Sequence, residues 1–489
     1  MKAFMKWGCI CTYACGFAFC LFSCLSLRRF SVLCLVVAAS LAVMQNRDRR
    51  KQIADAGNWF VAHTKATLAI LFVVAIIMRV CFALSLPEDG IWHIQGNDPR
   101  KFWEYAHEMA SGTFPDVKSW THTFLLSLSI RAFGDTLVPV ILTNTFLQFA
   151  TAITLYAFAR KVFSCGAAIC TAAIYLLSPS LVHINFCARP ETLFFLFFAL
   201  TLLVLSKWVL EKQDKMLILL PPLIWLTIWT RGEAVLFLLL IPGCIAATMM
   251  ISSGQARREA LRALLFLIIL CLGFAVAGYS VNLRYHGTNT PLCSNDSWWP
   301  RLFGSNTASR GRVPGPKTSP KGIRLSSDKT LIFERYRKDH KNDADGGVLP
   351  RKSMHCPNEL IPYIKQEISR RWGALSTMEK LRFMIDKNWF PWNTPYAGKG
   401  QVPEKQILRT IRYDIATIIA ILICLFGLAR SVHLLKNRPL EHVDIVRAIP
   451  LLYLFGMVCV IAIAESNIRY GVIALLVCPL YAWPDDNHA

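Results

Sequence analysis

The composition, apolar runs and charge pattern of the sequence predict an all-α polytopic membrane protein. Of the 489 residues, 54% are hydrophobic and only 17% are charged. Several apolar runs are long enough to cross about 30 Å of hydrocarbon, which takes about 20 residues each. Lys and Arg number 53 against 31 Asp and Glu, so the net charge is +22. This excess indicates contact with the lipid bilayer at the cytoplasmic leaflet. No nucleic-acid partner is expected, because no soluble basic domain separates from the apolar runs.

Ten apolar runs are predicted membrane spans, with boundaries accurate to about 2–4 residues. They are roughly 66–86, 136–159, 165–183, 192–208, 216–230, 233–252, 263–282, 413–430, 448–463 and 471–484. They divide the chain into four regions. These are an N-terminal apolar segment with a basic cytoplasmic stretch (1–65), a core transmembrane module (66–282, first loop 87–135), a large basic loop after the seventh span (283–412) and C-terminal transmembrane helices (413–489).

Basic residues in the short connections fix the predicted orientation. They fall in alternate gaps, at Arg47 to Lys65, Arg160-Lys161, Lys207 to Lys215, Arg257 to Arg262 and Arg430 to Arg447. The positive-inside rule makes this side cytoplasmic, so the loops 87–135 and 283–412 are expected to be extracytoplasmic. The longer loop is itself basic, with 24 Lys and Arg against 11 Asp and Glu, but long loops translocate regardless of charge.

Residues 1–44 fit this order poorly. They offer one or two further spans broken at Arg28-Arg29, without the small-residue cleavage site of a signal peptide. From Met44 the chain reads as a conventional basic cytoplasmic start before a first span. Our hypothesis is that Met44 is the initiator and that 1–43 are not part of the native protein. Peptides covering Cys9 to Arg28 in the expressed protein would refute it.

The long loop is expected to contain helices of its own. Residues 358–372 have helical apolar spacing, and Ser376 with Glu379 forms a capping box that opens a second helix through Ile385. The stretch 328–341 is polar, with few apolar anchors. These helices are either a lid on the membrane surface or a small globular insertion. The loop cysteines Cys293 and Cys356 are either a disulfide or two free thiols.

Three short turns on the predicted outer side each contain both an Arg and a Glu. They are Arg189-Pro-Glu191, Arg231-Gly-Glu233 and Glu465-x-x-x-Arg469-Tyr470. Ionisable groups at span ends are costly and tend to face a polar cavity or each other. A single pair could simply extend to the interface and satisfy itself. Because all three turns carry such a pair, we expect at least two of them to line one polar cavity.

Asp98 is the sharpest candidate for a catalytic group. It lies in Asn97-Asp98-Pro99, directly after the first predicted span. One interpretation is a helix N-cap before Pro at the first helical position. The other is a general base that accepts a proton from an attacking hydroxyl, and both roles are compatible. Glu88 and Asp89 are rival carboxylates in a turn, where solvated charges are common.

Other polar residues of the first loop give weaker signals. Lys118 and His122 precede the next apolar stretch and would either meet a phosphate or be ordinary interface residues. Glu104 and Glu108 lie one turn apart and are expected on a solvated helix face. No His, Asp and Glu set at metal-ligand spacing and no nucleotide-binding glycine motif is found, so no metal and no cofactor are predicted.

Several short motifs occur in an order that resembles a known family. The family has an acidic motif in its first loop, and Asn97-Asp98 with Tyr105-Ala106 and Gly112 is similar to it. The family segment that follows this motif is similar to Lys118 to Gly134. Further similar segments are Ser178 to Leu193, Thr230 to Glu233, Asn282 to Asn306 and Glu465 to Tyr470. Together they resemble the GT-C glycosyltransferases, in particular bacterial relatives of the dolichyl-phosphate-mannose–protein mannosyltransferases (glycosyltransferase family 39-like). The family usually has Arg-Pro-Pro where this chain has Lys118-Ser119-Trp120.

The resemblance implies a GT-C-like helical bundle in a bacterial inner (plasma) membrane, with an extracytoplasmic active site. It implies inverting transfer of a hexosyl or pentosyl group from a polyprenyl-phosphate-linked sugar donor to an extracytoplasmic acceptor, whether lipid, glycan or protein. The first-loop Asp98 would be the base. Substrate would be bound by residues of the outer turns and loop, namely Lys118, His122, Arg189, Glu191, Arg231, Glu233, Glu465, Arg469 and Tyr470.

Two other functions remain open from the sequence. A membrane transporter would show internal repeats with interrupted spans in matching positions, and none is evident here. A polysaccharide polymerase or ligase also acts on lipid-linked glycans outside the membrane. The first-loop Asp and the late Arg-Tyr element favour the transferase. Loss of solute uptake on gene deletion would indicate the transporter. Loss of a glycan modification would indicate one of the enzymes that act on lipid-linked glycans.

Overall fold

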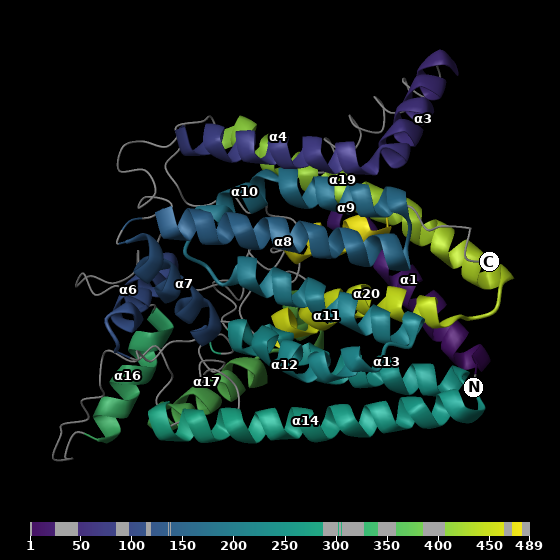
Figure 1. Cartoon of the computed structure of the whole chain (residues 1–489). Coiled ribbons are helices and arrows are strands. Elements are labelled where there is room, and N and C mark those ends of the chain that lie inside the picture. The colour runs from purple at the N-terminus through teal and green to yellow at the C-terminus, as the bar shows by residue number, and fades with distance from the viewer. Residues whose placement is uncertain are drawn as a thin grey trace.

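The protein is an elongated bundle of helices (Figure 1). The computed structural model describes residues 2–24, 47–84, 97–113, 119–134, 136, 138–286, 302, 305, 327–340, 358–384, 406–463 and 472–481. Within these residues every regular element is a helix, as predicted. The long helices run roughly antiparallel to their sequence neighbours, so that the connections gather at the two ends of the bundle (Figure 1).

Most of the described helices precede the large loop. They are α1 (Lys2–Cys24), α3 (Arg47–Ala62), α4 (Thr64–Leu84), α6 (Asn97–Ala110), α7 (Trp120–Phe133), α8 (Val138–Val162), α9 (Cys165–Leu177), α10 (Pro179–Asn185), α11 (Glu191–Glu211), α12 (Lys215–Thr230), η1 (Gly232–Leu236), α13 (Phe237–Ile251) and α14 (Gly254–His286). The second half adds α16 (Ser327–Asp339), η4 (Asn358–Leu360), α17 (Ile361–Gly373), α19 (Gln406–Asn437), α20 (His442–Ile463), α21 (Val472–Val477) and η6 (Cys478–Tyr481).

The helices confirm a multi-pass membrane protein. Among the described residues, five helical segments are long and apolar enough to cross a bilayer by length and composition. They are Thr64–Leu84, Val138–Val162, Glu191–Glu211, Gly232–Ile251 and Gly254–Val281. A bent pair, α9 with α10, would make a sixth, and α12 is a shorter apolar helix. Each of the ten predicted spans overlaps a described helix.

The predicted span 165–183 is broken, with a bend of 55° between α9 and α10. Pro179 begins α10 and has no N–H to continue the hydrogen bonds of α9. Two polar side chains satisfy carbonyls beside the break. The guanidinium of Arg79 donates to the carbonyl of Leu176 (3.3 Å), and the amide of Gln148 donates to the carbonyl of Leu181 (2.7 Å). Broken helices are tolerated at membrane depth where such partners are present.

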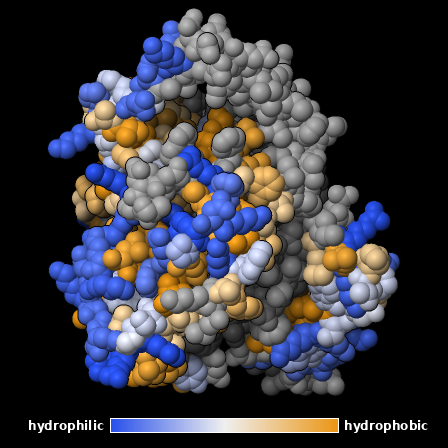
Figure 2. All heavy atoms as spheres, turned by 90° about the vertical axis from the view of Figure 1, so that its right-hand side faces the viewer, coloured by the Kyte–Doolittle hydropathy of each residue, from blue (hydrophilic) through white to orange (hydrophobic). Residues whose placement is uncertain are grey.

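The two ends of the bundle differ in character. The turns that follow α8, α11, α13 and α19 lie together at one end, and these are the predicted basic, cytoplasmic connections (Figure 1). Figure 2 views this end, where hydrophilic side chains gather with hydrophobic ones showing between them. The loop helices α6, α7, α16 and α17 lie at the other end (Figure 1). The bundle therefore separates the two classes of connection as the charge pattern predicts.

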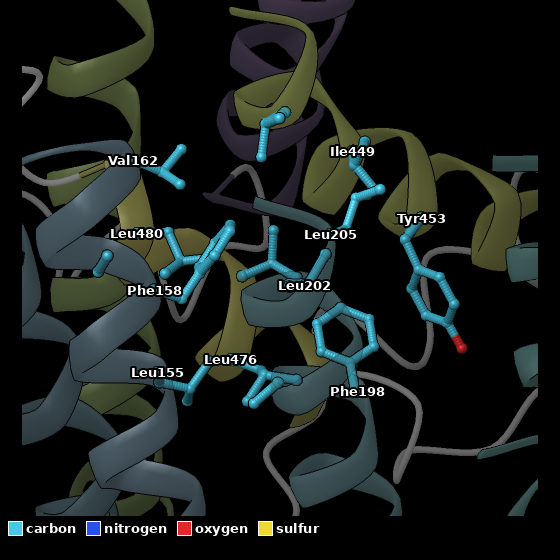
Figure 3. Close-up of a cluster of buried hydrophobic side chains, with 14 of the residues drawn as sticks. Leu155, Phe158, Val162, Phe198, Leu202, Leu205, Ile449, Tyr453, Leu476 and Leu480 are labelled. Carbon is cyan, nitrogen blue, oxygen red and sulfur yellow. The ribbon is translucent and has the colours of Figure 1, made fainter. Parts of the chain in front are cut away.

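The core joins helices from distant parts of the chain. Phe158 of α8, Phe198 of α11 and Leu480 of η6 are each fully buried in one cluster (Figure 3). The N-terminal α1 also packs here: Tyr13 is 1% exposed, and its hydroxyl donates to the carbonyl of Asp444 (3.3 Å). This packing does not identify the initiator residue, so a start at Met44 stays a prediction.

The described parts of the large loop form a small packed unit. The predicted helix at 358–372 is found as η4 and α17, and the predicted capping box is formed, with the Ser376 N–H donating to Glu379 Oε2 (2.8 Å). The sequence analysis did not predict α16. Its Ile332 is buried in a core shared with Leu360 of η4 and Ile364 of α17. The loop cysteines lie outside the described residues.

Candidate active site

Arg231 connects two of the three predicted outer turns. Its Nη1 lies 2.7 Å from Oε1 of Glu191, and its Nη2 and Nε lie 2.9 and 3.2 Å from the two oxygens of Glu233. The side chains of Arg231, Glu191 and Glu233 are only 11%, 3% and 18% exposed. The Arg231–Glu191–Glu233 set, called the clasp below, is thus one cation shared by two carboxylates. Its formal charge is −1.

Local backbone structure places each member of the clasp. Glu191 is the first residue of α11, following Pro190, where the positive end of the helix dipole favours a carboxylate. Arg231 ends α12 in an extended conformation, and Gly232 opens η1. The guanidinium also lies over the ring of Phe194, 5.9 Å from its centroid. Neighbouring ends of α11 and α12 therefore bring together residues 40 positions apart.

Asn144 of α8 holds the turn that carries Glu191. Its Nδ2 donates to the carbonyls of Asn185 (3.0 Å) and Cys187 (2.8 Å), and its Oδ1 accepts from the hydroxyl of Thr192 (2.7 Å). All of these groups are buried. A single amide thus satisfies three polar groups in a low-dielectric environment, which fixes the turn.

The first-loop helices dock beside the clasp. The Oγ of Ser119, just before α7, donates to the carbonyl of Thr230 (2.9 Å), the residue preceding Arg231. Arg131 at the other end of α7 donates to the last carbonyls of α6, at Met109 and Ala110. Trp103 of α6, Leu126 of α7 and Ala188 before the Glu191 turn belong to one buried apolar cluster. The described parts of the first loop, 97–113 and 119–134, are therefore packed against the clasp region.

His122 of α7 is neutral near physiological pH. It is 1% exposed, and burial lowers its pKa to about 4 although the charge of Glu191 raises it. Its ring meets Phe102 edge-on, and its Nδ1 has no hydrogen-bond partner among the described residues. A neutral imidazole can donate or accept one hydrogen bond at each nitrogen but supplies no charge to a phosphate.

Tyr453 of α20 is a residue of this region that sequence reasoning missed. Its ring contacts those of Phe194 and Phe237, with centroids 6.5 and 5.0 Å apart, and its hydroxyl interacts electrostatically with Glu233. The hydroxyl turns away from the apolar cluster (Figure 3), and no residue of the described chain hydrogen bonds to it. Gly456, one turn later in α20, lets α20 pack closely against η1, because a Cβ at Gly456 would lie 2.7 Å from the Leu236 side chain.

The predicted site residues are described to different extents. Helix α6 begins at Asn97, so Asp98 lies in its first turn, but the Asp98 side chain is outside the described residues. The same holds for Lys118, Glu465, Arg469 and Tyr470, and for the rival carboxylates Glu88 and Asp89. Arg189 is half-buried, and Glu104 and Glu108 are exposed as predicted. No group of three potential metal ligands is found within the described segments.

Comparison with known proteins finds a family likeness for part of the chain. Residues 117–280 match the family model described as dolichyl-phosphate-mannose-protein mannosyltransferase. The match covers 164 of the 489 residues, so the likeness to this family concerns that part of the chain. The matched segment includes His122, Asn144 and all three members of the clasp, and it ends before the large loop.

Other comparisons are weaker. The crystal structure of ArnT from Cupriavidus metallidurans bound to undecaprenyl phosphate is similar over 87% of this chain and 78% of that chain, with 14% sequence identity and a TM-score of 0.33. A similarity of this degree assigns no residue a role. No curated protein sequence matches the chain.

Proposed function

We propose that the chain is an integral-membrane glycosyltransferase that moves a sugar from a polyprenyl-phosphate donor to an extracytoplasmic acceptor. The observation that carries this proposal is the match of residues 117–280, because the matched family is named for a polyprenyl-phosphate-linked sugar. The clasp lies within that segment, at the bundle end opposite the basic connections. A bacterial plasma membrane with the site on its outer side is the corresponding location.

Asp98 is the proposed base. In an inverting transfer the acceptor oxygen attacks the anomeric carbon, its proton passes to a carboxylate, and the lipid phosphate leaves. Asp98 belongs to the first turn of α6, which packs on α7, and α7 is tied through Ser119 to Thr230 beside the clasp. This chain of contacts supports a place for Asp98 near the two buried carboxylates.

The clasp has a different proposed role from the other basic residues. Arg231 already bonds two carboxylates, so we assign it to orienting Glu191 and Glu233, whose oxygens would accept hydrogen bonds from sugar hydroxyls. Lys118, Arg189 and Arg469 would then stabilise the negative charge of the leaving phosphate. His122, Glu465 and Tyr470 complete the proposed substrate-binding set.

The test is Asp98→Asn in the purified full chain, supplied with polyprenyl-phosphate-linked sugars and candidate acceptors. Asn keeps the size of the side chain and its capping ability but removes its charge and basicity. A general base contributes typically about 10²–10⁴-fold in rate, so transfer should fall by that much while donor binding remains. Glu88→Gln and Asp89→Asn are the controls and should be mild. A fully active Asp98→Asn beside an inactive Asp89→Asn would move the base, whereas solute uptake without any transfer would favour a transporter.

A further inference from the structure

The α16–α17 pair of the large loop carries a second group of charges, away from the clasp. Leu302, Ile332, Leu360 and Ile364 are all fully buried between these helices and give the pair a core of its own. At the edge of this core, the carboxylate of Glu367 is fully buried as well. The pair lies at the same end of the bundle as α6 and α7 (Figure 1).

Three arginines surround the single carboxylate of Glu367. Arg370 binds it through two nitrogens, Nε at 2.9 Å and Nη2 at 2.6 Å. The Nε of Arg371 lies 2.8 Å and the Nη1 of Arg335 lies 3.0 Å from it. Arg371 also donates to the carbonyl of Leu302. These contacts, with the hydrogen bond from Arg370 first, hold the pKa of Glu367 at about 2, so the carboxylate is ionised at neutral pH.

The charges of this cluster do not balance. The carboxylate of Glu367 meets the exposed guanidinium groups of Arg335 and Arg370, which leaves a local charge of +1 with Arg371 not counted. A single bidentate arginine would already satisfy most of the carboxylate, and Arg370 provides it. Arg335 and Arg370 are 35% and 62% exposed, and within the described residues no partner is found for Nη1 of Arg370 or for Nη2 of Arg335. The surplus charge therefore coincides with accessible, unused N–H donors.

We propose that Arg335, Arg370 and Arg371 around Glu367 form an anion site that binds a phosphate group between Arg335 and Arg370. Guanidinium groups bind phosphate through paired N–H donors, and an anionic phosphate group would offset the surplus positive charge. Glu367 orients the arginines before the ligand arrives, which lowers the entropic cost of binding. This site is independent of the proposed transferase activity.

The phosphate has two chemical sources. One is the headgroup of an anionic lipid, and the other is a soluble phosphate. The purified full chain in neutral detergent is therefore titrated with sodium phosphate in one arm and with short-chain phosphatidylglycerol in the other, with phosphatidylcholine as the zwitterionic control. Binding in the first arm alone identifies a soluble phosphate, and a marked preference for phosphatidylglycerol identifies a lipid headgroup. Either result supports the site.

The chain offers a matched pair of variants. Arg335→Gln removes one guanidinium from the site but leaves the bidentate Arg370–Glu367 pair, so the helices should stay folded. Arg337→Gln makes the same change two residues away on α16, where the side chain is exposed and faces another direction. Arg335→Gln should weaken binding about tenfold or more, the effect of losing a charge-assisted hydrogen bond. Arg337→Gln should stay within about twofold, as expected for a remote screened charge.

Three outcomes would overturn the proposal. One is equal weakening by Arg335→Gln and Arg337→Gln, which would reflect the net charge of the loop rather than a site. Another is no binding of either probe by the wild-type chain. The third is a melting temperature that falls in Arg335→Gln while ligand affinity is unchanged, which would make the cluster purely structural. Arg370→Gln repeats the comparison with the more exposed guanidinium and should weaken binding at least as much.

Discussion

Replacing Arg231 by Gln should destabilise the protein strongly, because two poorly hydrated carboxylates would lose the same ion-pair partner. At about 4 Å and an effective dielectric constant of 20, each ion pair is worth about 4 kcal/mol of Coulomb energy. Glu191 is 3% exposed and cannot regain its hydration, whereas Glu233 at 18% recovers part of its own. Removing one partner of a buried pair typically costs about 3–5 kcal/mol, and we expect a loss of that size in the free energy of unfolding.

The assay is equilibrium unfolding of the purified chain in mixed micelles, followed by intrinsic fluorescence. Arg100→Gln is the matched control. Arg100 forms the same kind of pair, with Glu104 at 3.0 Å, but the two side chains are 71% and 54% exposed. An exposed i,i+4 pair contributes at most about 0.5 kcal/mol, so this variant should unfold almost like wild type.

A second substitution separates charge from packing. The double variant Arg231→Gln with Glu191→Gln also removes the more buried of the two carboxylates. This double variant should therefore be more stable than Arg231→Gln alone, a coupling that only interacting residues show. The reasoning is refuted if Arg231→Gln and Arg100→Gln unfold alike, or if the double variant is as unstable as the sum of its parts.

Three further predictions concern single groups. Tyr453→Phe should change the free energy of unfolding by less than about 0.5 kcal/mol, since no described residue bonds its hydroxyl, whereas Tyr481→Phe loses a hydrogen bond to the Arg447 carbonyl and about 1 kcal/mol. The pKa of Glu367 is lowered to about 2, so its ionised carboxylate contributes of order 3 kcal/mol to the free energy of unfolding; this contribution is complete above pH 4.5 and lost as pH falls through about 2. Hydrogen exchange of α17 should show this loss of stability, and Glu367→Gln should remove the pH dependence. The pKa of His122 is lowered to about 4, so the imidazole of the unfolded chain takes up a proton at a higher pH than that of the folded chain. The free energy of unfolding should therefore fall as pH drops from about 6.5 through 4, and His122→Gln should not show this pH dependence.

The sequence alone determined the membrane architecture. Span positions follow from local hydrophobicity, and the separation of basic connections from the outer turns follows from charge counted along the chain. The capping box at Ser376 and Glu379 was equally readable, since its two groups are three residues apart. The break at Pro179 was signalled by the residue itself, although whether a helix continues past a proline depends on partners such as Arg79 and Gln148.

The tertiary structure decided which charges meet. Each predicted outer turn contains an Arg and a Glu, but Glu191 bonds Arg231 of the next turn, because the start of α11 and the end of α12 lie side by side. Helix α16 escaped prediction because its few apolar residues gain their burial only against α17. His122 likewise is neutral only because α7 is packed into the bundle. Ion pairing and burial depend on neighbours that are distant along the chain, and a local sequence pattern does not indicate which residues these are.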